Sequence, residues 1–210
     1  MFCMIWGARI AAHHSDRPHS MYMNVPGLKI VLPSTASDAK GLIKTAIRED
    51  DPVIFFQDRA VIYGTKGEVP DGDFTVPFGV GSIKRLGSDV TIVSIGGMLP
   101  MALAAAQDLE QEGISVEIVD PRSLVPLDKG IILESVAKTG HLVVVDNAPR
   151  RCSAASEIAA MVAQEGFWDL KSPIVRVASE NVHIPFTPVL EDLVYPTKEK
   201  IIKGVRDTLE

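Results

Sequence analysis

Blocks of hydrophobic and polar positions alternate regularly along the second half of the chain. Continuous apolar runs of strand length are followed by stretches with apolar residues at helical spacing, so strand and helix alternate four times. This pattern predicts an α/β fold with a mainly parallel sheet flanked by helices. The expected strands are 91–95, 114–118, 142–145 and 173–177. The expected helices begin near Leu99, Asp128, Ser153 and Thr197.

The chain before residue 80 reads as a separate, smaller α/β unit. Residues 28–32 and 53–56 have strand character, and the apolar pattern between them predicts a helix that Ser37 caps. The stretch 64–77 is rich in glycine, proline and charge, which is typical of a boundary. We therefore expect two domains, 1–80 and 81–210.

Composition and charge exclude several classes of protein. The net charge of −6 disfavours nucleic acid and anionic membranes as partners. Cys3 and Cys152 are the only cysteines, so no disulfide framework is indicated and a cytoplasmic location fits. The uncharged run 90–106 is interrupted by Gly96-Gly97 and by Pro100, which favours a strand, a turn and a helix start over a membrane span.

The first candidate for chemistry is a histidine pair, His13-His14, followed by Ser15 in a polar stretch. Imidazole titrates near neutral pH and therefore suits proton transfer to and from an oxygen derived from a carbonyl. On the residues alone, two adjacent histidines in a loop are more often solvated or structural. A zinc site that adds His19 is the weaker interpretation, because no cysteine or further spaced ligand follows.

The second candidate is the segment 46–52, at the end of the first predicted helix. Carbonyl groups at a helix C-terminus lack helical partners, and the helix dipole favours a cation there. On the sequence alone, a solvated acidic turn is the better interpretation of this segment.

Three further patterns have ordinary explanations. Gly79-Val80-Gly81 and Gly96-Gly97 lack the spacing of a dinucleotide fingerprint, so turn formation is expected. Arg150-Arg151-Cys152 has the composition of a phosphate or thiolate site, but a surface loop at the end of a strand is the simpler interpretation.

The order of short motifs then indicates a family. The chain resembles the β chain of the thiamine-dependent decarboxylase component of 2-oxo-acid dehydrogenase complexes over about 200 of its 210 residues. Residues 63–70 also resemble the β chain of acetoin dehydrogenase, and the two relatives are not separated by the sequence. The motifs are His14-Ser15, Pro26–Lys29, Asp38–Leu42, Asp51–Phe55, Gly81–Thr91, Val119–Asp128 and Ile184–Glu191.

The resemblance implies a fold and a reaction. Residues 1–80 would be the C-terminal portion of a pyrimidine-binding domain, and 81–210 a transketolase C-terminal-like domain. The implied reaction is decarboxylation of a 2-oxo acid such as pyruvate on thiamine diphosphate, followed by acyl transfer to a lipoyl group. The implied partners are an α chain that supplies the diphosphate and magnesium site, a second β chain, and the lipoyl acyltransferase core.

The resemblance also assigns residues. His14 matches the family's catalytic histidine at the substrate pocket, and His13 stands where the family usually has glutamine. Some members hold a structural potassium ion through backbone carbonyls at the end of the first helix. The matching positions are Ala46, Ile47, Glu49 and Asp51, with Glu49 replacing the usual aspartate.

A non-catalytic class competes with the enzyme interpretation. In the family, the part of the β chain that carries the thiamine-activating glutamate precedes the region matched here, so this chain starts in mid-domain and is expected to be inactive alone. A truncated dimerisation or assembly module is the alternative.

Overall fold

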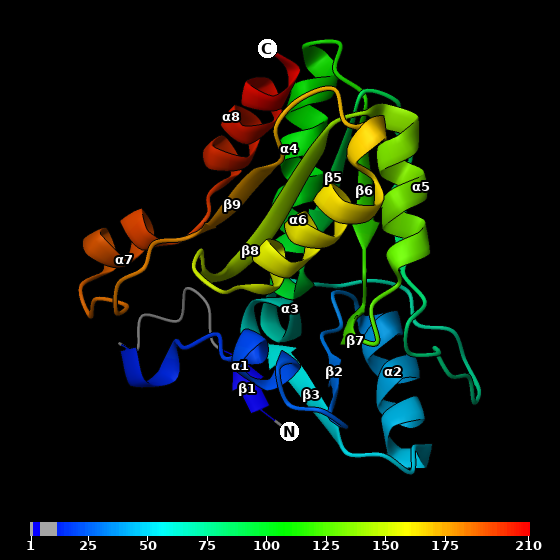
Figure 1. Cartoon of the computed structure of the whole chain (residues 1–210). Helices are drawn as coiled ribbons and strands as arrows, with labels where there is room; N and C mark the ends of the chain where they lie inside the picture. The colour runs from blue at the N-terminus through cyan, green and yellow to red at the C-terminus, as the bar shows by residue number, and fades with distance from the viewer. Residues whose placement is uncertain (1, 5–11) are drawn as a thin grey trace.

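The computed structural model describes residues 2–4 and 12–210, and its strands form two sheets (Figure 1). The described chain reaches from β1, beside the label N, to the end of α8, beside the label C, at the opposite end of the molecule. The N-terminal sheet occupies the lower part of Figure 1 and the larger C-terminal sheet the upper part.

The N-terminal sheet has four strands in the order β1-β3-β2-β7. The first three are parallel, and β7 joins β2 in the antiparallel direction. The strands are β1 (Phe2–Met4), β2 (Lys29–Val31), β3 (Val53–Asp58) and β7 (Ser123–Val125). Because β7 comes from the second half of the chain, the two predicted domains share a sheet.

The C-terminal sheet has five strands in the order β4-β6-β5-β8-β9. All are parallel except β4, which pairs with β6 in the antiparallel direction. The α/β class with a mainly parallel sheet is thereby confirmed. The strands are β4 (Ser82–Arg85), β5 (Val90–Ser94), β6 (Val116–Asp120), β8 (Leu142–Pro149) and β9 (Val175–Ser179).

Helices cover both faces of this sheet (Figure 1). One face packs against α4 and α8 around a core that includes Ile92, Leu109 and Val205. The other face packs against α5 and α6. The four helices are α4 (Leu99–Gln111), α5 (Lys129–Thr139), α6 (Ala154–Glu165) and α8 (Lys198–Leu209).

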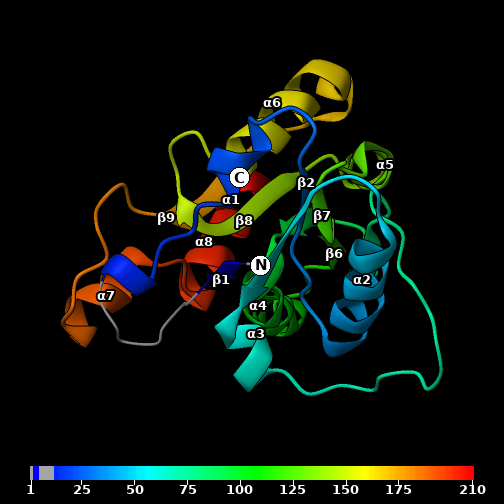
Figure 2. The same cartoon turned by 90° about the horizontal axis from the view of Figure 1, so that it is seen from below.

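The remaining helices are short, except for α2, which packs against the N-terminal sheet. Leu42 on α2 packs with Val31 and Phe55 of that sheet. Seen from below, α7 and α2 lie on opposite sides of the molecule (Figure 2). These elements are η1 (Ala12–His14), α1 (His19–Met23), α2 (Ala36–Arg48), α3 (Arg59–Gly64), η2 (Gly96–Met98), η3 (Phe167–Asp169) and α7 (Pro188–Val194).

Three details of the predicted elements were wrong, and one of them is the strand expected at 173–177, which runs from Val175 to Ser179. The hydroxyl oxygen of Thr35, rather than Ser37, accepts from the backbone N–H of Asp38 at 3.1 Å and caps α2, so Ser37 lies inside the helix. The strand expected at 114–118 runs from Val116 to Asp120 instead, and all five of its residues are buried. In a strand buried on both faces, burial does not alternate from residue to residue, so the alternation of apolar and polar residues is a poor guide to where the strand begins.

The uncharged run 90–106 folds as the strand β5, the single turn η2 and the start of α4. Within the part of the chain that the structure describes, no helix has the length and apolar character needed to cross a membrane.

Candidate functional site

The histidine loop, residues 12–17, begins with the short helix η1 and leads towards α1. His13 and His14 are both exposed, and their ring centroids are 4.2 Å apart with the rings tilted at 44°. The N–H of Ser15 donates to the carbonyl of Ala12 at 3.2 Å and closes the turn. The loop therefore presents two imidazoles to solvent from a single turn of backbone.

The third histidine of this region has a different environment. His19 is fully buried at the start of α1, and its Nε2 lies 3.2 and 3.3 Å from the two carboxylate oxygens of Asp146. Burial alone would raise the pKa of Asp146, but the His19 ring and two backbone N–H groups lower it below its ordinary value. His19 thus links α1 to the end of β8.

Arg17 ends the histidine loop with a buried guanidinium group. Its side chain donates through Nη1 to the carbonyls of Ser15 and Asp16, at 3.1 and 3.3 Å. Burial lowers the pKa of Arg17, although the carboxylates of Asp58 and Asp146 act in the opposite direction. The residue is only 5% exposed, so its charge is balanced mainly by those neighbouring carboxylates.

Asp58 and Asn147 join the two sheets behind this loop. The Asn147 amide donates to the Asp58 carboxylate at 2.9 Å, and both residues are almost completely buried. Asp58 ends β3, while Asn147 lies in β8 next to Asp146. Carboxyl ends of parallel strands from both sheets therefore meet at the histidine loop.

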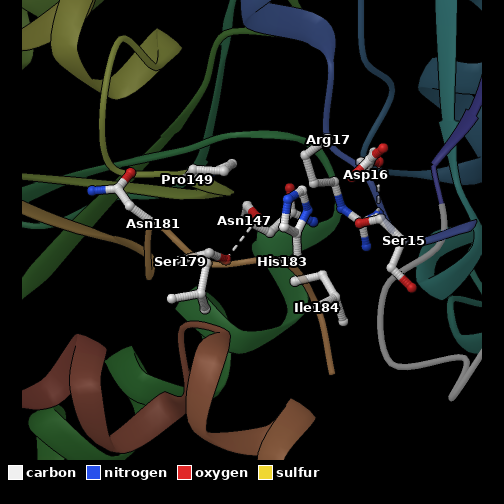
Figure 3. Close-up of a pocket in the computed structure, with 10 residues that line it drawn as sticks. Ser15, Asp16, Arg17, Asn147, Pro149, Ser179, Asn181, His183 and Ile184 are labelled. Carbon is white, nitrogen blue, oxygen red and sulfur yellow. Dashed lines mark hydrogen bonds between the residues drawn. The ribbon is translucent and has the colours of Figure 1, made fainter. Parts of the chain in front are cut away.

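A cavity of about 370 Å³ opens beside this network (Figure 3). The histidine loop forms one side of it, and the ends of β8 and β9 with the chain after β9 form the other. His14 is not among the residues that line it. The polar lining residues include Ser15, Arg17, Asn147, Ser179, Asn181 and His183.

The four positions assigned to potassium lie together at the C-terminal end of α2. Ala46 and Ile47 are in its last turn, Glu49 is the residue after it, and Asp51 follows. Lys29 Nζ pairs with the carboxylates of Glu49 and Asp51 at 2.8 and 3.1 Å, so a cation would have to be held by carbonyls. In the described part of the chain, no backbone N–H outside α2 donates to those four carbonyls. The residues therefore fit a carbonyl-bound ion, and the site stays a prediction.

The two glycine motifs and the segment Arg150-Arg151-Cys152 have the turn and loop structure that was expected of them. Cys152 is exposed in the loop before α6, with a φ of 48°. Arg150 Nη2 donates to the carbonyl of Arg176 at 2.8 Å. Gly96 has a φ of 52° and begins the turn η2, and Gly79 has a φ of 74°.

Most of the buried part of this site was not predicted from the sequence. Arg17, Asp58, Asp146 and Asn147 were not singled out, and His19 was considered only as a zinc ligand. A usable signal was present, because Asp58 and Asp146-Asn147 each follow an apolar run at the carboxyl end of a parallel strand, where α/β proteins gather functional groups.

Comparison with known proteins then identifies the family. Residues 79–201 match the family described as "Transketolase, C-terminal domain", and residues 1–63 match "Transketolase, pyrimidine binding domain". The chain belongs to the transketolase family. The predicted division of this transketolase-family chain at residue 80 falls close to the start of the first match and stays a prediction.

Several curated relatives are named as β subunits. The "Acetoin:2,6-dichlorophenolindophenol oxidoreductase subunit beta" of Bacillus subtilis (strain 168) is 47% identical over 203 residues, covering 97% of this chain and 59% of the relative. Its counterpart in Cupriavidus necator is 48% identical over 204 residues, with coverages of 97% and 60%. The "Pyruvate dehydrogenase E1 component subunit beta" of Rhizobium meliloti (strain 1021) is 43% identical over 200 residues, with coverages of 95% and 43%.

A solved structure of similar fold is described as "Split gene transketolase, inactive beta4 tetramer". It superposes with a TM-score of 0.83 at 27% identity, covering 99% of this chain and 65% of that one. The transketolase-like fold is therefore confirmed. The chain spans about three fifths of the length of the first two relatives.

Proposed function

We propose that this chain is part of the β subunit of a thiamine-dependent decarboxylase of the pyruvate dehydrogenase type. The supporting observation is its similarity to such β subunits over almost the whole chain. The reaction would be decarboxylation of a 2-oxo acid, with transfer of the acyl group to a lipoyl group. The partners would be an α chain, a second β chain and the lipoyl acyltransferase core.

In this proposal His14 is the acid–base residue. It is exposed on the histidine loop, and this exposure supports a role in contact with a partner subunit or a substrate. Its ring nitrogens are suited to giving a proton to, or taking one from, an oxygen derived from the substrate carbonyl. His19, bound to Asp146 in the interior, would hold the structure behind the loop instead.

Thiamine diphosphate, when bound, supplies the ring that stabilises the negative charge left by decarboxylation. We assign its diphosphate and magnesium to the α chain. The described residues of this chain include no group of three or more His, Cys, Asp and Glu side chains placed to hold a metal ion. Potassium would be bound by the carbonyls of Ala46, Ile47, Glu49 and Asp51.

Acetoin dehydrogenase is the second candidate, and one observation favours it. The two acetoin-enzyme relatives are 47% and 48% identical to this chain, against 43% for the pyruvate dehydrogenase relative. Both candidates use the same histidine loop. Comparing pyruvate with acetoin as substrates of the assembled enzyme separates them.

The test uses this chain within a β subunit of the relatives' full length, assembled with its α chain. We expect His14→Ala to lower the rate of acyl transfer to a lipoyl domain by about 10²- to 10⁴-fold, the usual loss for a positioned acid–base group. His13→Ala is the matched control and should retain most of the activity. An active His14→Ala enzyme would contradict the assignment, and an assembled wild type that accepts neither substrate would favour the assembly-module alternative.

A further inference from the structure

We propose that Arg17 is a positioning residue, which holds the backbone of the histidine loop so that His14 keeps one orientation. The inference about the loop stands on the geometry of this chain. Its consequence for catalysis rests on the proposed function.

His14 is not held by its own side chain. Its imidazole is exposed, and the only interaction found for it among the described residues is the ring contact with His13. A catalytic group must be kept close to its productive geometry, and a misplacement of about 1 Å can cost about 10²-fold in rate. The orientation of His14 must therefore come from the backbone of residues 12–17.

Arg17 provides bonds to that backbone. The carbonyls of Ser15 and Asp16 follow directly after the turn of η1, where carbonyl groups lack helical partners. Nη1 of Arg17 donates to both, at 3.1 and 3.3 Å. One guanidinium nitrogen thus fixes two consecutive peptide groups next to His14, through bonds that its charge strengthens.

The guanidinium group is itself held by the second half of the chain. It lies 5.9 Å from the centroid of the Tyr195 ring, just after α7, a distance suited to a cation–π contact. The buried carboxylates of Asp58 and Asp146 supply the compensating charge. Arg17 therefore bonds to the exposed loop through Nη1, while its charge interacts with carboxylates at the strand ends of both sheets.

The surroundings of Arg17 also indicate that it affects the order of the histidine loop more than the stability of the whole fold. Nε and Nη2 of Arg17 are buried and have no hydrogen-bond partner among the described residues. Unpaired buried donors are unfavourable, and replacing Arg17 by methionine removes them. The loss of the two loop bonds is then partly offset in overall stability, while the loop itself becomes looser.

The first experiment measures hydrogen exchange of the Ser15 amide, which bonds to the carbonyl of Ala12, in the 210-residue chain. We expect Arg17→Met to accelerate this exchange by about tenfold or more, the effect of losing a hydrogen bond to a charged group. Arg206→Met is the matched control, because Arg206 pairs with Glu112 on the surface at 2.7 Å. Arg206 belongs to α8, which lies in the upper part of the molecule, away from the N-terminal sheet (Figure 1).

Arg17→Lys keeps the charge but loses the planar group, and we expect a smaller acceleration. If Arg17→Met does not fold, the exchange rate of the Ser15 amide in Arg17→Lys tests the proposal instead. Unchanged exchange at Ser15 in every folded Arg17 variant would overturn the proposal.

The second experiment measures kinetics in the assembled full-length enzyme. We expect Arg17→Met to lower kcat with little change in KM, and Arg17→Met combined with His14→Ala to be no slower than His14→Ala alone. Losses that multiply in the double variant would overturn the positioning role, because Arg17 would then act independently of His14. An active His14→Ala enzyme refutes the proposed function instead, and the exchange experiment still decides the role of Arg17 in the loop.

Discussion

At the scale of single residues, two glycines in polar loops have opposite surroundings. Gly87 precedes β5, and a Cβ atom built on it would overlap the backbone of Val116 and Glu117. Gly67 lies in the exposed connection between α3 and β4, where a Cβ atom would meet nothing within 4 Å. Neither glycine has a positive φ, so the difference between them is one of space alone. Close packing of loop backbone against β6 is therefore what requires glycine at position 87.

We expect Gly87→Ala to lower the free energy of unfolding by about 1–3 kcal/mol or more, since backbone atoms of a buried strand cannot move aside cheaply. Gly67→Ala should change it by less than about 1 kcal/mol in either direction. Urea unfolding followed by circular dichroism measures both. Equal effects of the two substitutions would show that the loop at Gly87 can shift away from β6.

At the scale of elements, an ionic cluster joins the start of α2 to the C-terminal domain. Asp38 is buried in the first turn of α2, and its carboxylate lies 2.5 Å from Lys84 Nζ and 2.8 Å from Arg122 Nε. Burial alone would raise the pKa of Asp38, but Lys84, Thr35 and Arg122 lower it below its ordinary value. Lys84 also lies 3.5 Å from the buried Asp120, whose pKa burial raises. The cluster therefore stabilises the junction when Asp38 is ionised.

The pH dependence of this contribution has a definite sign. Because the pKa of Asp38 is lower in the folded than in the unfolded chain, its stabilisation is fully present above the ordinary value of about 3.9 and is lost as the pH falls through the folded-state value. We expect Asp38→Asn to cost about 3 kcal/mol at pH 7, the lower end for a broken buried pair, and less at pH 3. Asp73→Asn is the control, since the pairs of Asp73 with Lys44 and Arg48 are exposed and screened. Urea unfolding at both pH values measures this, and a cost that grows towards acid would contradict the sign.

The elements that the sequence predicted are those with a regular apolar period and a local cap. Ser153 caps α6 through its bond to the N–H of Ser156, and Gly140 ends α5 with a φ of 80°, as expected from residue type alone. The sequence did not predict β7 or α1, because short elements are stabilised by distant partners rather than by local pattern. For the same reason it identified the exposed His14 through family resemblance but missed Arg17 and the buried carboxylates, whose roles depend on strand ends brought together by folding.

At the scale of the whole molecule, one hydrophobic core extends across the predicted domain boundary. Ile30 and Phe56 of the N-terminal sheet, and Leu32 just after β2, pack with Val93 and other residues under α5 and α6. Among the residues that the structure describes, the core beneath α4 and α8 is, by contrast, formed by residues after position 81. The C-terminal part therefore has one complete core of its own and one that it shares.

This arrangement leads to a prediction for the fragment 81–210. We expect it to unfold cooperatively, because the core beneath α4 and α8 includes none of the described residues among the first 80. It should be less stable than the whole chain, since the shared core loses Ile30, Leu32 and Phe56 and β7 loses its partner β2. The apolar surface so exposed, together with the symmetric pairing of β chains that the family resemblance implies, should make the fragment a dimer. Urea unfolding compares the stabilities, and light scattering gives the mass directly. A fragment that is folded yet monomeric at tens of micromolar would refute the dimer, and a fragment without a cooperative transition would show that the two halves fold only together.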